Sequence, residues 1–119
     1  MLTTKFAHEF STAWITAWNA HNPTQVLEYY CDDFEMSSPF ITKIVGNNSG
    51  ILQGKNAAEN YWRIGLAEYP ESHFTHETTL VGAHSITIIY KGAQGLAAEV
   101  LFFNDDFKVI KSSAHSLQP

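Results

Sequence analysis

The stretch Ala97-Ala98-Glu99-Val100-Leu101-Phe102-Phe103 decides how the fold of this chain is interpreted. It has the composition of a β-strand, in which alternate residues face opposite sides. One face carries Ala97, Glu99, Leu101 and Phe103, and the other carries Ala98, Val100 and Phe102. Because both faces are apolar, we expect both to be covered.

Glu99 is the exception on this strand, because it is a single carboxyl group among apolar residues. A buried carboxylate without a partner is costly, and its pKa rises until the neutral form is favoured. Such a residue is a candidate for function. The alternative is that Glu99 lies at a sheet edge, or pairs with a lysine or tyrosine.

Strand-like runs extend on both sides of this stretch. They cover about 73–81, 85–91, 96–103 and 107–116. The turns between them are short and contain Gly, Asn or Asp, which is typical of β-hairpins. We therefore expect an antiparallel meander in the second half of the chain.

The first half of the chain has helical periodicity. Apolar residues predict a helix from Thr4 to Ala20, a short helix capped by Asn22 that buries Tyr30, and a third helix over 56–68. A short strand is expected over 34–38. The segment from Phe40 to Gly54 is expected to be either a mobile loop or a hairpin followed by a loop, and to act either as a lid or as a plain surface loop. Helices packed on one side of a curved antiparallel sheet make an α+β fold shaped like a cone, with an interior.

Composition excludes several classes of function. The chain has 7 basic and 12 acidic residues and a net charge of -5, and the basic residues are scattered, so nucleic acid is not an expected partner. Its single cysteine excludes an internal disulfide, and no run approaches the ~20 apolar residues of a membrane helix. Without a signal peptide at the N-terminus, we expect one cytoplasmic domain over residues 1–119.

The histidines do not form a metal-binding pattern. His73, His76 and Glu77 have the right side chains for metal ligands, but residues three apart on a strand point to opposite faces. There is no HExxH motif and no cysteine pair. We therefore expect no metal and no cofactor.

Several segments resemble the nuclear transport factor 2-like superfamily in order and spacing. They are WITAWNAHN at 14–22, LEYYCDDF at 27–34, SSP at 37–39, GKNAA at 54–58 and NYWRIGL at 60–66. The branch that the chain most resembles contains the SnoaL-like and ketosteroid isomerase-like proteins. The resemblance implies a cone-shaped, cystatin-like α+β barrel. It also implies a homodimer through the outer sheet face, which fits the apolar Val100 and Phe102.

The resemblance also implies positions for catalytic groups. In the isomerase, an Asp base moves a proton, while a Tyr and a protonated Asp bind the developing oxyanion. These positions correspond to Ser38, Trp14 and Glu99. Serine is no base near neutral pH without an activator, and indole is a larger and different donor than phenol. Ketosteroid isomerase activity is therefore not expected, but a pocket with a buried carboxyl group is.

By the same alignment, further residues are expected to line this pocket and contact a ligand. They are Phe10, Trp18, Tyr61, Trp62, Ile88, Tyr90, Leu101 and Ser112. His115 is a further candidate for the mouth of the cone. The alternative is that the large aromatic side chains fill the cone and leave no cavity.

Three functions follow from these observations. The first is an isomerase, cyclase or dehydratase that acts on a small apolar carbonyl compound, with Glu99 as acid or hydrogen-bond donor and Trp14 and Ser38 as polar contacts. The second is a binding protein without chemistry, which the missing base at Ser38 favours. The third is an interaction protein with a filled cone and a working outer sheet face.

Overall fold

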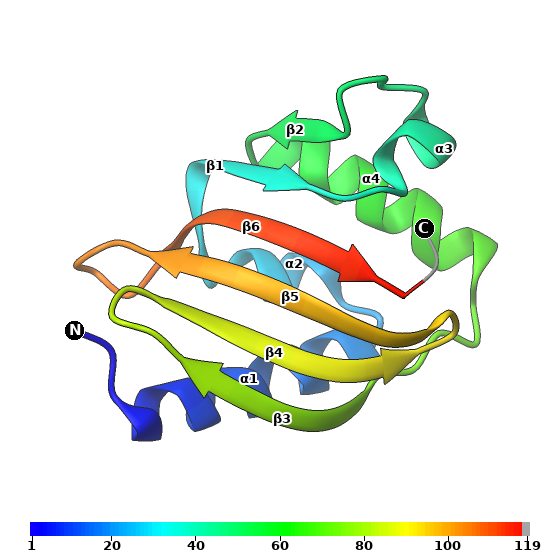
Figure 1. Cartoon of the computed structure of the whole chain (residues 1–119). Helices are drawn as coiled ribbons and strands as arrows, with labels where there is room; N and C mark the ends of the chain where they lie inside the picture. The colour runs from blue at the N-terminus through cyan, green and yellow to red at the C-terminus, as the bar shows by residue number, and fades with distance from the viewer. Residues whose placement is uncertain (118–119) are drawn as a thin grey trace.

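A computed structural model describes residues 1–117 of the chain. The helices are α1 (Thr4–Asn19), α2 (Pro23–Leu27), α3 (Ile41–Val45) and α4 (Lys55–Glu68). The strands are β1 (Tyr30–Ser37), β2 (Ile51–Gln53), β3 (Thr75–Val81), β4 (Ser85–Gly92), β5 (Gly95–Phe103) and β6 (Val109–Ser116). The strands form one curved sheet in the order β2-β1-β6-β5-β4-β3, which confirms the α+β class (Figure 1).

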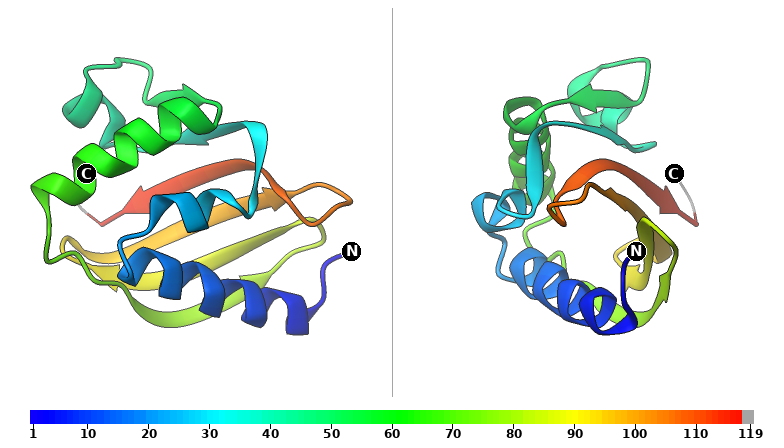
Figure 2. Two further views of the ribbon diagram at one scale, coloured as in Figure 1. Left: turned by 180° about the vertical axis from the view of Figure 1, so that it is seen from behind. Right: turned by 90° about the vertical axis from the view of Figure 1, so that its left-hand side faces the viewer.

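Helices α1, α2 and α4 lie along the concave side of the sheet, as Figure 2 shows from two further directions, and the short α3 lies at the β2 edge. Helix α1 begins after Thr3, whose hydroxyl accepts a hydrogen bond from the Phe6 amide at 3.0 Å. Its buried stripe includes Phe10 and Trp14, which pack against the sheet. This arrangement confirms the predicted cone. None of the helices in the described part of the chain is long and apolar enough to cross a membrane.

The meander β3–β6 is antiparallel, as its short turns predict. The expectation of a wholly antiparallel sheet is wrong at one place, because β1 pairs with β6 in parallel. These two strands are separated by most of the chain, and a long connection permits a parallel pairing that a hairpin does not.

Strand β1 is longer than the short strand predicted over 34–38. Tyr30 is its first residue and pairs with Val109, so its predicted place in the second helix is wrong. The physical reason is that α2 spans only Pro23–Leu27, and the Val109 amide then binds the carbonyl of Tyr29 at 2.9 Å. This backbone pairing draws the chain into the sheet directly after the helix.

The segment expected to be irregular up to Gly54 contains α3 and β2. Ile41 at the start of α3 is fully buried, and Gly46 ends the helix in the left-handed conformation at φ 77°. Strand β2 then pairs with β1 in an antiparallel way. That the segment between β1 and Gly54 acts as a lid stays a prediction.

The core lies between the helices and the concave face of the sheet. The opposite face of β5 is only partly covered within one chain, since Val100 is half-buried and Phe102 is 39% exposed. Leu80, on β3, is 57% exposed. The chain itself thus leaves these last two apolar side chains of the outer sheet face open to solvent, among polar neighbours such as Thr87, Lys111 and Ser113. That a second copy covers this face stays a prediction.

Candidate functional site

A cavity of about 230 Å³ opens at one end of the cone. Its walls come from α1, α3, α4, the segment before β3, the β4–β5 turn and the end of β6. In Figure 1 the turn between β4 and β5 and the end of β6 meet at the same end of the molecule. The aromatic side chains that line it are Trp14, Trp18, Phe40, Tyr61, Trp62, Tyr69, Phe74 and Tyr90.

The three indoles pack against one another and leave this cavity open. The ring centroids of Trp14 and Trp18 lie 6.0 Å apart at 74°, and those of Trp18 and Trp62 lie 4.9 Å apart at 84°. Edge-to-face packing of this kind is favourable for aromatic rings. It keeps the indoles on the helical side of the cone, so the alternative of a filled cone is wrong.

Glu99 lies on the concave face of β5, between Ile88 of β4 and Ala114 of β6. It lines the cavity and is only 7% exposed. Within residues 1–117, no hydrogen bond or ion pair engages its carboxyl group. Burial raises the pKa of Glu99 to about 8, because the charged form loses its hydration. At neutral pH the group is therefore mostly a neutral acid that can donate a hydrogen bond.

Three tyrosines lie near enough to this carboxyl group for its charge to affect them. Tyr30 comes from β1, Tyr61 from α4 and Tyr90 from β4. Burial, and secondarily the negative charge of Glu99, raises the pKa of Tyr30 and of Tyr90. Burial also raises the pKa of Tyr61, with a smaller contribution from Glu99. The three phenols therefore remain neutral hydrogen-bonding groups near Glu99.

Trp14 reaches this cluster through one hydrogen bond. Its indole Nε1 donates to the hydroxyl oxygen of Tyr30 at 3.0 Å, and both side chains are buried. Trp14 lines the cavity with its ring, but its only polar atom is already engaged. Its geometry favours a role as a wall and as a support for Tyr30.

Ser38 follows β1 and lines the cavity, at 6% exposure. Its Oγ accepts hydrogen bonds from the Tyr61 hydroxyl at 3.2 Å and from the Phe40 amide at 3.2 Å. An activating base would have to accept the serine proton, and no such contact occurs in the described part of the chain. The position of Ser38 fits a fixed acceptor and does not fit a catalytic base.

The structure brings together seven of the residues that the sequence singles out. On the cavity wall lie Trp14, Trp18, Ser38, Tyr61, Trp62, Tyr90 and Glu99. Phe10, Ile88, Leu101 and Ser112 do not line it, contrary to expectation, and are buried deeper in the cone. Phe10 is one helical turn before Trp14 and packs on Phe103 at 5.0 Å. Which of these residues bind a ligand stays a prediction.

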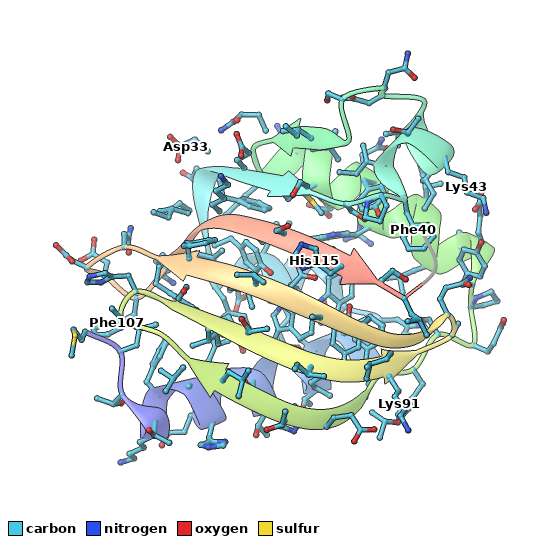
Figure 3. The ribbon with its side chains drawn as sticks, in the orientation of Figure 1. Asp33, Phe40, Lys43, Lys91, Phe107 and His115 are labelled. Carbon is cyan, nitrogen blue, oxygen red and sulfur yellow. The ribbon has the colours of Figure 1, made fainter. Side chains whose placement is uncertain are left out.

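The ring of His115 does not point into the mouth of the cone. Strand β6 passes the cavity at this residue, but the ring Nε2 lies 3.2 Å from the Ser113 hydroxyl. Ser113 in turn accepts from the Ser37 hydroxyl at 3.3 Å. In Figure 3 the His115 ring lies on the outer side of the sheet, away from the helices.

The wall also includes residues that the sequence reading missed. Phe74, just before β3, has its ring 4.4 Å from that of Tyr90. Its backbone is held by Asn19, whose Nδ2 donates to the Phe74 carbonyl at 2.9 Å and whose Oδ1 accepts from the Phe74 amide at 2.7 Å. No local pattern signals this contact between residues 55 positions apart in the chain.

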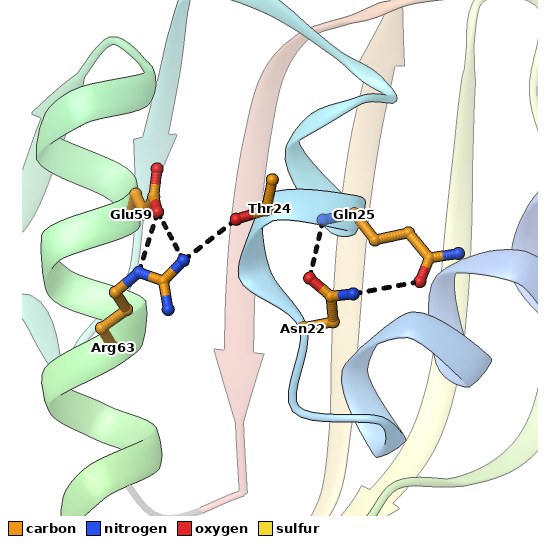
Figure 4. Close-up of polar contacts among 5 residues, drawn as sticks. All are labelled: Asn22, Thr24, Gln25, Glu59 and Arg63. Atoms are coloured by element: carbon orange, nitrogen blue, oxygen red, sulfur yellow. Dashed lines mark hydrogen bonds and ion pairs between the residues drawn. The ribbon is translucent and has the colours of Figure 1, made fainter.

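Helix α4, which carries Tyr61 and Trp62, is tied to α2 by polar contacts (Figure 4). The Arg63 guanidinium lies 2.7 Å from the Glu59 carboxylate and donates to the Thr24 hydroxyl at 3.0 Å. At the other side of α2, the Asn22 side chain accepts from the Gln25 amide at 3.1 Å. Of these contacts, the bond from Arg63 to Thr24 joins the two helices, while the other two stabilise α4 and the start of α2.

A cone with an aromatic cavity and one buried, unpaired carboxyl group defines an α+β domain with an internal pocket. The particular family follows from comparison. The family model of the SnoaL-like domain matches residues 11–106, so the chain belongs to the SnoaL-like family. No curated protein matches the chain.

Solved structures agree with this assignment. The chain is 48% identical to a SnoaL-like protein of unknown function from Burkholderia thailandensis, with 96% of each chain covered and a TM-score of 0.91. An NTF2-like protein of unknown function from Cytophaga hutchinsonii is 12% identical, with 98% of this chain and 91% of that chain covered and a TM-score of 0.68.

A third similar structure is SalBIII, an epoxide hydrolase/cyclase-like enzyme with a role in pyran ring formation in the polyether salinomycin. It is 11% identical, with 99% of this chain and 95% of that chain covered and a TM-score of 0.74. At this identity the likeness shows the fold alone. The resemblance inferred from the sequence motifs is thus confirmed at the level of superfamily and fold.

Proposed function

We propose that this protein acts on a small, apolar carbonyl compound, and that Glu99 donates a hydrogen bond or a proton to the ligand oxygen. The observation that carries this proposal is the buried, unpaired Glu99 carboxyl group on the wall of an aromatic cavity. Its raised pKa, about 8, supports a donor role at neutral pH. The aromatic wall suits the apolar body of such a ligand.

Tyr90 is the natural second donor in this proposal. It lines the cavity near Glu99, and within residues 1–117 its hydroxyl has no hydrogen-bond partner. Two neutral donors in a water-poor site stabilise negative charge that develops on a ligand oxygen. Trp14 and Ser38 contribute less directly, because they hold Tyr30 and Tyr61 in place.

The reactions that fit are those in which one carboxyl group can both give and take a proton. In a ring closure, a substrate hydroxyl forms a new C–O bond while the C–O bond to the leaving oxygen breaks. Glu99 gives its proton to the leaving oxygen, and the resulting carboxylate takes the proton of the attacking hydroxyl. Isomerisation and dehydration likewise need one group that gives and takes a proton. Glu99 alone can supply it, so these reactions do not need a base at Ser38.

The test of this proposal uses a ketone and its hydrocarbon analogue, 1-tetralone and tetralin. Binding is measured by quenching of tryptophan fluorescence, and turnover by screening epoxides, enones and hydroxyketones. We expect Glu99→Gln to lose turnover and Tyr90→Phe to weaken 1-tetralone binding without weakening tetralin binding. Full activity of Glu99→Gln on an identified substrate would contradict the proposal.

A binding protein without chemistry is the second candidate. The observation that favours it is the engagement of Ser38, which accepts two hydrogen bonds and has no activating base beside it. In this case the ligand raises the melting temperature and is recovered unchanged after incubation. Recovery of a rearranged product would exclude this second candidate.

We also propose that two copies pair through the outer sheet face. The exposed apolar side chains Leu80 and Phe102, which share this face, support this proposal, since burying them against a second copy would remove apolar surface from water. Val100, on the same face of β5, is half-buried. A cytoplasmic location stays a prediction from the sequence.

A further inference from the structure

The cavity wall holds one carboxyl group and, among residues 1–117, no lysine or arginine that could pair with it. This carboxyl group belongs to Glu99. The one histidine of the wall, His115, turns its ring to Ser113 on the outer face. The carboxyl group of Glu99 therefore lacks a counter-ion, while the rest of the wall is mainly aromatic.

The wall near Glu99 offers phenol oxygens as acceptors, and among residues 1–117 its unengaged donors are the Tyr90 hydroxyl and the buried Trp18 Nε1. The Tyr61 hydroxyl proton is used on Ser38, which leaves the Tyr61 oxygen free to accept. The indole N–H of Trp14 donates to the Tyr30 hydroxyl and is not available to a ligand. The Tyr90 oxygen is also open, and with the Glu99 carboxyl group it completes a set of oxygen acceptors.

We propose that the cavity also binds small hydrophobic amines, with the ammonium group beside the Glu99 carboxylate and the apolar body among the aromatic rings. An ammonium group has only donors, so it matches these oxygen atoms. Faces of Trp and Tyr rings attract cations, most strongly when water is excluded. The inference rests on the aromatic cavity and its unpaired carboxyl group, and it does not depend on carbonyl chemistry.

Amine binding is coupled to a proton. The groups that interact with Glu99 are the phenols of Tyr30 on β1, Tyr61 on α4 and Tyr90 on β4, and all three stay neutral because burial raises each pKa. The flanking residues on β4 and β6 are Ile88 and Ala114. Below about pH 8 the free carboxyl group is neutral, so formation of the ion pair releases one proton to solvent.

The experiment uses four ligands that share one bicyclic ring system: the unsubstituted hydrocarbon and its ketone, amine and carboxylic acid derivatives. These are tetralin, 1-tetralone, 1-aminotetralin and tetralin-1-carboxylic acid, titrated calorimetrically into the full chain at pH 6.5. We expect the amine to bind at least about tenfold more tightly than tetralin, and the carboxylate not to bind. Titration in two buffers of different ionisation enthalpy should show proton release that approaches one per amine and is absent for tetralin.

Glu99→Gln supplies the matched variant, because it keeps the shape and cannot ionise. The amine should lose its advantage over tetralin in this variant, and tetralin affinity should not change. Proton release needs only the wild-type chain, so it stands if the variant does not fold. An amine that binds no better than tetralin, or that releases no proton, overturns the inference. Binding of 1-tetralone tests the carbonyl proposal separately, because a ketone accepts from the neutral carboxyl group and does not pair with the carboxylate.

Discussion

The Tyr61 hydroxyl donates a hydrogen bond to Ser38 Oγ at 3.2 Å and so joins α4 to the end of β1 across the cavity wall. This bond makes Ser38 an acceptor with a structural task. It also sets the direction of the Tyr61 proton, which points to Ser38 and leaves the phenol oxygen to face a ligand. Ser38 is thus held as a hydrogen-bond acceptor, which does not suit a catalytic base.

Removal of this bond should cost stability. We expect Tyr61→Phe to lower the free energy of unfolding by about 1 kcal/mol, because Ser38 Oγ loses one of its two donors. Urea denaturation measures the change. A cycle with Ser38→Ala should show non-additive effects, since the two side chains share one bond. Tyr69→Phe is the control, at a partly exposed tyrosine of the same wall, and should be nearly neutral.

The pH dependence of stability should show the burial of Glu99. Its pKa is about 8 in the folded state and near 4.5 when unfolded, so the folded state holds the proton more tightly. Stability contributed by the neutral form is complete at low pH and falls as pH rises from about 4.5 to about 8. Glu99→Gln should lack this fall, as measured by urea unfolding at several pH values.

Glu71→Gln is the matched control for this experiment, because Glu71 is exposed on the segment after α4. It should keep the pH profile of the wild type. If Glu99→Gln instead shows the same fall, or is destabilised by several kcal/mol at every pH, the carboxylate is a paired structural group and the donor role is wrong.

Ligand binding should follow the same titration. The neutral carboxyl group donates to a ketone oxygen, and the carboxylate cannot. We therefore expect the affinity for 1-tetralone to fall as pH rises through about 8, while tetralin affinity stays constant. Fluorescence titrations from pH 6 to 9 measure both ligands. A constant preference for the ketone over this range would argue against Glu99 as the donor.

Asn19 should control the shape of the cavity. Asn19→Ala removes both hydrogen bonds to the Phe74 backbone and should cost about 1–3 kcal/mol of stability. Because Phe74 packs on Tyr90, the variant should also bind tetralin several-fold more weakly. Denaturation and fluorescence titration provide the two measurements. Asn48→Ala, at an exposed asparagine, is the control and should change neither.

Self-association should depend on the outer sheet face. Phe102→Asp places a charge on this face and should turn a dimer into a monomer in sedimentation experiments. Phe107→Asp changes an exposed phenylalanine on the turn after β5, outside this face, and should leave the dimer intact. A wild-type chain that sediments as a monomer at all concentrations would exclude the homodimer.

Local patterns were sufficient to predict much of the site. The alternation along β5 correctly placed Glu99 toward the interior, because side chains of a strand point to opposite faces at every step. Helical spacing placed Trp14 and Trp18 on one side of α1, where both line the cavity. Local patterns failed for Tyr30, because its place in β1 depends on a distant strand.

The sequence by itself therefore determined α1, α4, the β3–β6 meander, the inward face of β5 and the burial of one carboxyl group, since these depend on neighbours a few positions apart. Only the tertiary structure decided the parallel pairing of β1 with β6 and two hydrogen-bonded contacts. These are the bond from Asn19 to the Phe74 backbone and the bond from Tyr61 to Ser38. Each of these contacts joins residues far apart in the chain. Their geometry follows from how the curved sheet and helices pack, which no local periodicity contains.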